Sequence, residues 1–296
     1  MTAAHRNHGS CAPARMTRFD DIYTQPDPRP YFRTLGPLGY RTPHYAQGLF
    51  RRLAHHIGIP GPTGEGGDRR ATVLDVCCSY GINAALLNHH VTWDELHTRY
   101  TSPQAARWTT AELIEADLAY YAARRRSDAV PVIGLDIAAP ALAYARAAGL
   151  LDAAFAENLE TAPPTPALRR AAGGVRLITV TGGASFLSAR TFHALLDSTE
   201  RPPWVAAFVL RTGSYGDIAI GLAEHGLVTE KDTARTYPQR RFTDARERQY
   251  AIAAVTAAGD DPHGAETGDH FHTALHLSRP AVEAAAEPLH TVLRAP

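Results

Sequence analysis

The chain has 296 residues, of which 45% are hydrophobic and 20% are charged, and its 30 basic residues balance 30 acidic ones. This length and composition predict a globular protein with a sizeable core and no general affinity for nucleic acids or anionic membranes. No apolar run approaches the roughly 18 residues of a membrane helix, and three cysteines are too few for a disulfide framework, so we expect a cytoplasmic protein.

The first part of the chain changes character twice. Residues 1–18 are small, polar and without periodicity, which indicates a disordered tail. Residues 19–69 combine aromatic residues and prolines with a helix over 45–57 and a glycine-rich linker over 58–70. The aromatic residues predict a layer packed on the main domain, a lid over a ligand site, or both. The lid residues of interest are Tyr23, Tyr31, Tyr40 and Tyr45.

An apolar run over 73–76 is the first predicted strand, and it contains the carboxylate of Asp75. Small residues follow at alternate positions, Cys77, Ser79 and Gly81, before a helix that includes Asn83. This order of strand, tight turn and helix is typical of a nucleotide-binding junction in an open α/β sheet. A dinucleotide fingerprint is absent because the third glycine position is occupied by isoleucine, and a P-loop is excluded because Lys231 is the only lysine.

An insertion over 89–128 separates this unit from the next strand and carries helical patterns over 93–100 and 110–126, the second with a threonine N-cap. The strand over 130–136 ends in Asp136, and a helix follows from Pro140 to Ala147. In nucleotide-binding α/β folds, an acid at the tip of the second strand binds the ribose hydroxyls.

The remaining elements continue the alternation of strands and helices. Strands are expected over 153–159, 175–181, 205–210 and 227–230, with helices over 166–172, 192–198 and 218–225. The segment 248–257 is interpreted as a seventh strand hairpinned to the sixth. A last segment, 270–277, alternates with strand periodicity and predicts an extra strand in a C-terminal extension over 259–296. We expect its three histidines, at 270, 272 and 276, to form an exposed polar face rather than a metal site.

The stretch around Asp75 resembles the first motif of the class I S-adenosylmethionine-dependent methyltransferases, in which an acid precedes three small residues at alternate positions. Cys77 and Ser79 stand where that family usually has glycine. The resemblance covers roughly residues 70–258. It implies an α/β fold with a seven-stranded Rossmann-like sheet, here with an N-terminal aromatic helical lid and the helical insertion.

The resemblance also implies that S-adenosylmethionine binds along the carboxyl ends of the strands. Asp136 matches the ribose-binding acid, Asn158 the residue beside the adenine, and Thr181 the strand end that opens onto the substrate. The implied cofactor-binding set is Asp75, Cys77, Ser79, Gly81, Asn83, Asp136, Ile137, Asn158, Leu159 and Thr181.

The resemblance implies methyl transfer to a small molecule, of the kind found in secondary metabolism, by a protein that needs no metal. An alternative within the fold is a cyclase in which S-adenosylmethionine is itself the substrate and yields azetidine-2-carboxylate and methylthioadenosine. A non-catalytic binder is a third. Tyr23, Tyr31 and Tyr40 are the predicted catalytic residues, because aromatic faces attract a sulfonium. His193, Glu157 and a lid tyrosine remain unranked candidates for a general base, and a homodimer is compatible with the sequence.

Overall fold

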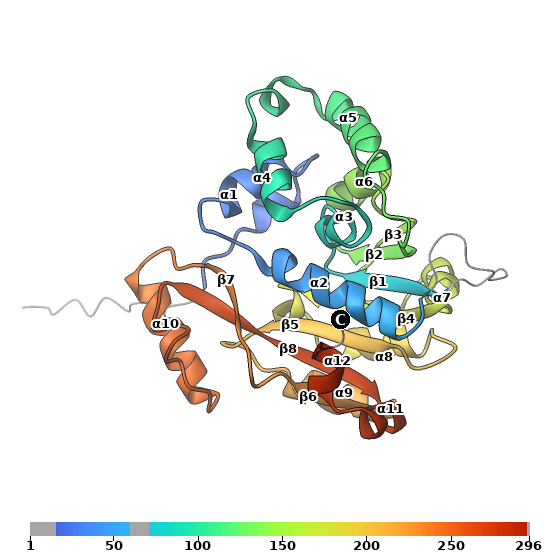
Figure 1. Cartoon of the computed structure of the whole chain (residues 1–296), viewed down its shortest axis with the longest axis vertical. Helices are drawn as coiled ribbons and strands as arrows, with labels where there is room; N and C mark the ends of the chain where they lie inside the picture. The colour runs from blue at the N-terminus through green and yellow to red at the C-terminus, as the bar shows by residue number, and fades with distance from the viewer. Residues whose placement is uncertain (1–15, 60–70, 295–296) are drawn as a thin grey trace, which may run out of the picture.

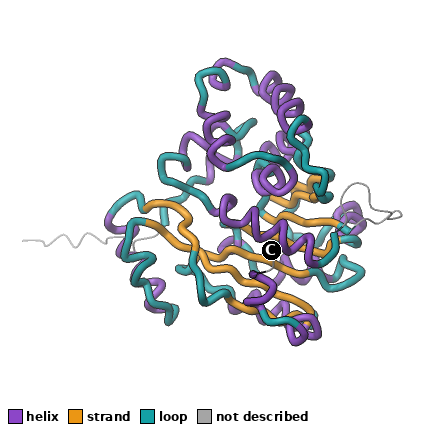
Figure 2. The backbone as a smooth tube through the Cα atoms, viewed as in Figure 1, coloured by secondary structure: helices purple, strands orange, loops and turns teal. Residues whose placement is uncertain are grey.

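The computed structural model describes residues 16–59 and 71–294, and the predicted tail and linker lie mostly outside these ranges. The strands of one continuous sheet cross the centre of the molecule (Figure 2) in the order β3-β2-β1-β4-β5-β8-β6, with β7 pairing to β8. They are β1 (Thr72–Val76), β2 (Val132–Asp136), β3 (Ala153–Ala156), β4 (Val175–Thr181), β5 (Trp204–Leu210), β6 (Leu227–Lys231), β7 (Tyr237–Arg241) and β8 (His270–Pro280).

The first five strands are parallel, and β8 runs antiparallel to β5 and β6. Strand order reverses between β1 and β4, and such a switch point in an open α/β sheet is where ligands bind. The predicted fold class is confirmed: the chain has an α/β fold with a seven-stranded Rossmann-like sheet, which β7 extends.

Helices cover both faces of the sheet (Figure 1). They are α1 (Arg29–Leu35), α2 (Thr42–His56), α3 (Ile82–Asn88), α4 (Trp93–Thr101), α5 (Thr110–Ala122), α6 (Ala139–Ala147), α7 (Pro166–Ala172), α8 (Ala189–Leu196), α9 (Gly216–Glu224), α10 (Ala245–Ala257), α11 (Ala281–Ala286) and α12 (Leu289–Arg294). One core joins the sheet to α2, α3 and α6, and a second joins its other face to α7, α8 and α9. The central strands are therefore buried on both sides, which explains their continuous apolar runs.

The N-terminal segment and the insertion pack together as the lid (Figure 1, α1 beside α4). Phe32 of α1 stacks on Tyr100 of α4, with ring centroids 4.9 Å apart, and lies 5.3 Å from the Trp93 ring. Thr92 and Thr109 close capping boxes at the starts of α4 and α5, so both insertion helices begin at their expected residues. An aromatic core that the lid shares with α3 and α6 therefore makes it a defined layer on the main domain.

Two assignments at the C-terminal end were wrong. The segment 248–257 lies in helix α10, because Asp244 caps the Glu247 N–H and the alanine-rich sequence turns Ala251 and Val255 inward one helical turn apart. The strand that pairs with β6 is β8, which lies between β5 and β6. The predicted extra strand is therefore part of the main sheet, and the sheet extends past residue 258. The expected exposed histidine face is instead half-buried, and the His276 ring packs 4.7 Å from the Tyr215 ring on that face.

No helix within 16–59 and 71–294 is long and apolar enough to cross a membrane.

Candidate functional site

The loop from β1 to α3 has a left-handed backbone at every second residue. The angle φ is 58° at Cys77, 50° at Ser79 and 72° at Gly81. Residues other than glycine rarely adopt this conformation, because Cβ then crowds the backbone at a cost of roughly 1–2 kcal/mol per residue. The three small positions of the motif are therefore the positions at which the turn requires left-handed geometry. Strain of this kind clusters at functional sites.

Asp75 is buried beneath this loop, with 1% of its surface exposed. Its carboxylate accepts hydrogen bonds from Thr179 Oγ1 (2.8 Å) and from Asn83 Nδ2 (3.0 and 3.1 Å). Asn83 Nδ2 also donates to Thr181 Oγ1 (2.6 Å). The network joins the carboxyl ends of β1 and β4 to the first turn of α3, so three of the predicted cofactor residues lie together.

Asp136 faces the same loop from the end of β2. Its Oδ2 accepts a hydrogen bond from the Ser79 N–H (2.8 Å), and its Oδ1 accepts one from the Ala138 N–H (2.8 Å). Ile137 leaves 71% of its surface exposed beside this carboxylate. The exposed apolar side chain of Ile137, next to the Asp136 carboxylate, forms a surface on which a planar ring could pack.

The other predicted adenine contacts follow β3, the strand next to β2. Asn158 is exposed, and its Oδ1 accepts a hydrogen bond from the Glu160 N–H (3.0 Å). Leu159 is buried in the core, with 3% of its surface exposed.

Three tyrosines form a row over the loop. The Tyr31 ring lies 6.0 Å from Tyr23 and 6.1 Å from Tyr40, and all three meet edge to face. At one end Tyr23 lies close enough to Asp136 and Cys77 to interact with both. At the other end, the Tyr40 hydroxyl would be 2.9 Å from a Cβ placed on Gly182. The row therefore spans the loop from β2 to β4, whereas Tyr45 packs on Tyr237 instead.

Burial sets the protonation of this site. It raises the pKa of Tyr40 to about 12 and the pKa values of Tyr23 and Tyr31 well above their usual range, so these phenols stay neutral and are poor bases. Burial also raises the pKa of Asp75 to about 7, although the hydrogen bonds from Thr179 and Asn83 lower it in part. A carboxyl poised near neutral pH suits proton transfer, and sequence reasoning missed this property.

The two cysteines fill space beside glycines. A Cβ on Gly183 would be 2.4 Å from the Cys77 Cβ, and a Cβ on Gly134 of β2 would be 2.8 Å from the Cys78 Sγ. Burial raises the pKa of both thiols, which keeps them protonated and weakly nucleophilic.

Gln239 of β7 is a site residue that the sequence did not single out. Its side chain is buried, with 3% exposed, and its Nε2 would be 4.0 Å from a Cβ on Gly182, on which the Tyr40 hydroxyl also converges. The segment 231–247 has a charged composition, and only the pairing of β7 with β8 brings it here.

Two of the base candidates have other partners. His193 Nδ1 lies 2.8 Å from His225 Nε2, and Glu157 accepts hydrogen bonds from Thr165 N (2.9 Å) and Oγ1 (2.6 Å). Within the described ranges, no three metal-ligating side chains gather in one place.

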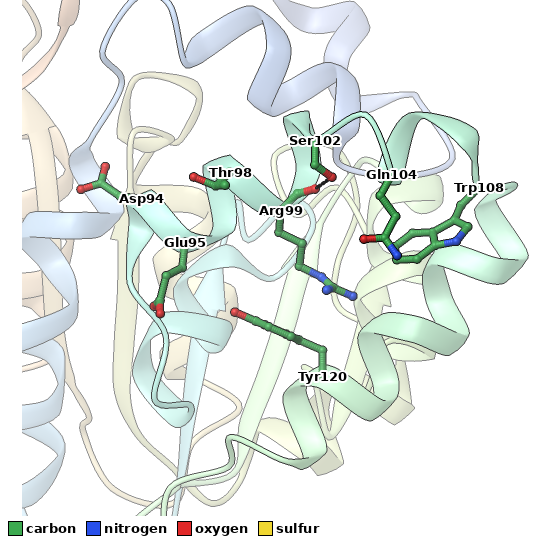
Figure 3. A pocket seen from close by; sticks show the side chains of 8 residues that line it. All are labelled: Asp94, Glu95, Thr98, Arg99, Ser102, Gln104, Trp108 and Tyr120. Atoms are coloured by element: carbon green, nitrogen blue, oxygen red, sulfur yellow. Dashed lines mark hydrogen bonds between the residues drawn. The ribbon is translucent and has the colours of Figure 1, made fainter.

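A separate cleft of about 500 Å³ lies between α4 and α5 (Figure 3). Arg99 points across it between Tyr120 and Trp108, with its guanidinium carbon 4.2 Å and 5.9 Å from the two ring centroids. None of the predicted cofactor residues lines this cleft.

No family model and no curated protein matches this sequence. Among solved structures, the chain is similar to magnesium protoporphyrin IX methyltransferase from Synechocystis PCC 6803 with bound SAM (12% identity, 79% of this chain and 77% of that one, TM-score 0.38). It is also similar to a SAM-dependent methyltransferase from Aquifex aeolicus (10% identity, 80% and 92%, TM-score 0.38) and to the plantazolicin methyltransferase BamL (10%, 88% and 96%, TM-score 0.36). These similarities are distant, and the fold rests on the strand order described above.

Proposed function

We propose that the protein is an enzyme that binds S-adenosylmethionine at the β1–α3 loop and transfers its methyl group to a small molecule. One observation carries the proposal: three alternate left-handed residues turn between the carboxylates of Asp75 and Asp136, at the switch point of the sheet. The solved methyltransferases named above include one with bound SAM, which is consistent with it.

The residues of the site fit this ligand. Asp136 can accept hydrogen bonds from ribose hydroxyls, and an adenine ring on Ile137 would cover its exposed surface. Ser79 Oγ and Asn83 Oδ1 are buried and have no hydrogen-bond partner within 16–59 and 71–294, so polar groups of a ligand would satisfy them. The row Tyr23, Tyr31 and Tyr40 offers π-faces to a cation, an interaction worth roughly 0.5–2 kcal/mol.

S-Adenosylmethionine supplies a carbon that is already activated by the adjacent sulfonium. The work of the chain is then to orient the reactants and exclude water. Tyr31 and Tyr40 are buried and Tyr23 is half-buried, and the row would exclude water by covering the loop. Asp75, with its raised pKa of about 7, is our candidate for receiving a proton released by the nucleophile.

Calorimetric titration with S-adenosylmethionine and S-adenosylhomocysteine tests the binding step. We expect saturable binding by the wild type and at least about tenfold weaker binding by Asp136→Ala, because hydrogen bonds to this charged group are lost. Asp128→Ala removes an exposed carboxylate in the insertion and serves as the control. No binding by the wild type, or equal binding by both variants, would overturn the proposal.

Intramolecular cyclisation of S-adenosylmethionine is the second candidate, and the tyrosine row favours it. The Tyr40 hydroxyl of the lid approaches Gly182 closely and leaves little space there. Such a covered site suits a reaction that needs no second substrate. Incubation with S-adenosylmethionine alone, followed by mass spectrometry, separates the candidates. Methylthioadenosine released without an acceptor supports cyclisation. Tight binding without turnover supports an acceptor-dependent transferase or a non-catalytic binder.

A further inference from the structure

The side chain of Gln239 is buried but carries an unpaired polar atom. Its Oε1 has no hydrogen-bond partner among the described residues, although only 3% of the residue is exposed. A buried polar atom left unpaired costs roughly 1–3 kcal/mol, so such atoms are commonly paired by a ligand or water. Gln239 lies beside Gly182, which follows Thr181 at the end of β4 and therefore borders the network of Asp75 and Asn83.

Strand β7 is held firmly enough to make this placement specific. The next residue, Arg240, is 1% exposed and forms a two-armed ion pair with Glu247 of α10 (2.6 and 3.0 Å). The Gln239 carbonyl accepts a hydrogen bond from the Arg41 N–H (2.9 Å), just after Tyr40 in the lid. The backbone at Gln239 is thus fastened between α10 and the lid.

The unsatisfied atoms around Gly182 share one chemistry. Gln239 Oε1 and Asn83 Oδ1 are both amide oxygens, and Asn83 is itself 9% exposed. The Asp75 carboxylate lies beside Asn83, whose Nδ2 donates a hydrogen bond to it. The site therefore has hydrogen-bond acceptors to spare, and a primary ammonium group has three donors and no acceptor.

We propose that Gln239 is a positioning residue that accepts a hydrogen bond from the α-amino group of the bound ligand. This inference rests on the proposed function and assigns to that site a residue from β7, outside the seven-strand order. In methyl transfer the contact would anchor the amino-acid end of the ligand. In cyclisation a base such as Asp75 would first take one proton from the ammonium group. Gln239 would then orient the neutral amine, whose lone pair forms a bond to the γ-carbon as the carbon–sulfur bond breaks and methylthioadenosine leaves with that electron pair.

A thermodynamic cycle between protein and ligand tests this contact. We would titrate wild type and Gln239→Leu with S-adenosylhomocysteine and with its analogue lacking the α-amino group. We expect Gln239→Leu to weaken binding of the amine-bearing ligand roughly ten- to hundredfold, the effect of a hydrogen bond to a charged group. Binding of the deaminated analogue should change by less than about twofold, because the partner is already missing. Gln104→Leu, in the cleft between α4 and α5, should change neither.

Other results overturn the inference. Equal weakening of both ligands would mean that Gln239 only supports the fold. If Gln239→Leu binds both ligands as tightly as the wild type does, Gln239 does not contact the amine. The same conclusion would follow if the wild type bound the two ligands equally. Gln239→Glu keeps an acceptor oxygen and should retain the preference for the amine, which covers the case in which the leucine variant melts early. Failure of the wild type to bind either ligand would instead remove the proposed function itself.

Discussion

At the scale of residues, the β1–α3 loop shows how the structure accommodates Cys77 at a position where the family motif usually has glycine. Cys77 has a left-handed backbone and a side chain, and the space for that side chain comes from Gly183, across the site after β4. The two positions are therefore complementary. A resemblance to the family motif could reveal the cysteine but could not reveal its partner 106 residues away.

Gly183→Ala should test this complementarity. A Cβ at 183 would overlap the Cys77 Cβ, and overpacking of this kind costs roughly 1–3 kcal/mol of the free energy of unfolding. Cys77→Gly should restore most of the loss in the double variant, measured by urea denaturation. Additive effects of the two substitutions would show that the residues do not interact.

The buried carboxyl of Asp75 predicts a pH dependence of stability. Its pKa rises from 3.8 in the unfolded chain to about 7 in the folded one, so the folded state holds more protons between these values. The free energy of unfolding should therefore fall as pH increases from about 4 to about 7. Asp75→Asn cannot titrate and should lose less stability over this window in denaturation curves at pH 4.5 and 7.5. The same decline in both proteins would exclude Asp75 as its source.

At the scale of elements, the sequence predicted strands well wherever one continuous apolar run was required. The parallel strands β1, β2, β4 and β5 are buried on both faces, and their runs place Asp75 and Asp136 at the expected edge. The prediction of a strand over 248–257 was wrong because β7 is short and charged, whereas α10 contains alanine and β-branched residues. Only tertiary pairing to β8 makes β7 a strand, and no local pattern encodes it.

The ion pair of Arg240 and Glu247 predicts how strongly β7 depends on α10. Burial alone would raise the pKa of Glu247, but hydrogen bonds from Arg240, Thr17 and Thr243 lower it to about 2. Glu247→Gln would leave the buried guanidinium without a counter-charge and should cost roughly 3–5 kcal/mol of the free energy of unfolding. The exposed pair of Arg241 and Asp269 offers a control, because Asp269→Asn should cost less than about 1 kcal/mol. Equal costs for the two variants would contradict the role assigned to burial.

At the scale of the whole molecule, the protein consists of a sheet that carries the predicted cofactor residues and an aromatic layer, the lid, that lies over them. The aromatic composition of residues 19–45 predicted a packed layer or a lid. The structure confirms the packed layer, since its aromatic side chains share a core with α3 and α6 and its tyrosines reach the loop. That this layer covers a ligand stays a prediction. Tyr23, Tyr31 and Tyr40 were predicted from the sequence and are the tyrosines that form the row, and their catalytic role stays a prediction. The sequence did not reveal the packing of α1 on α4, which assembles the row.

A lid that buries its own tyrosines must move to admit a ligand, and Trp93 should report this movement. Its ring is 3% exposed and lies 5.9 Å from Tyr40 and 6.3 Å from Tyr31, so a ligand against the row changes its surroundings. We expect S-adenosylhomocysteine to produce a saturable change in tryptophan fluorescence that is lost in Trp93→Phe. The change should persist in Trp108→Phe, whose ring lines the separate cleft. A signal that survives in Trp93→Phe would show that the ligand enters without disturbing the lid.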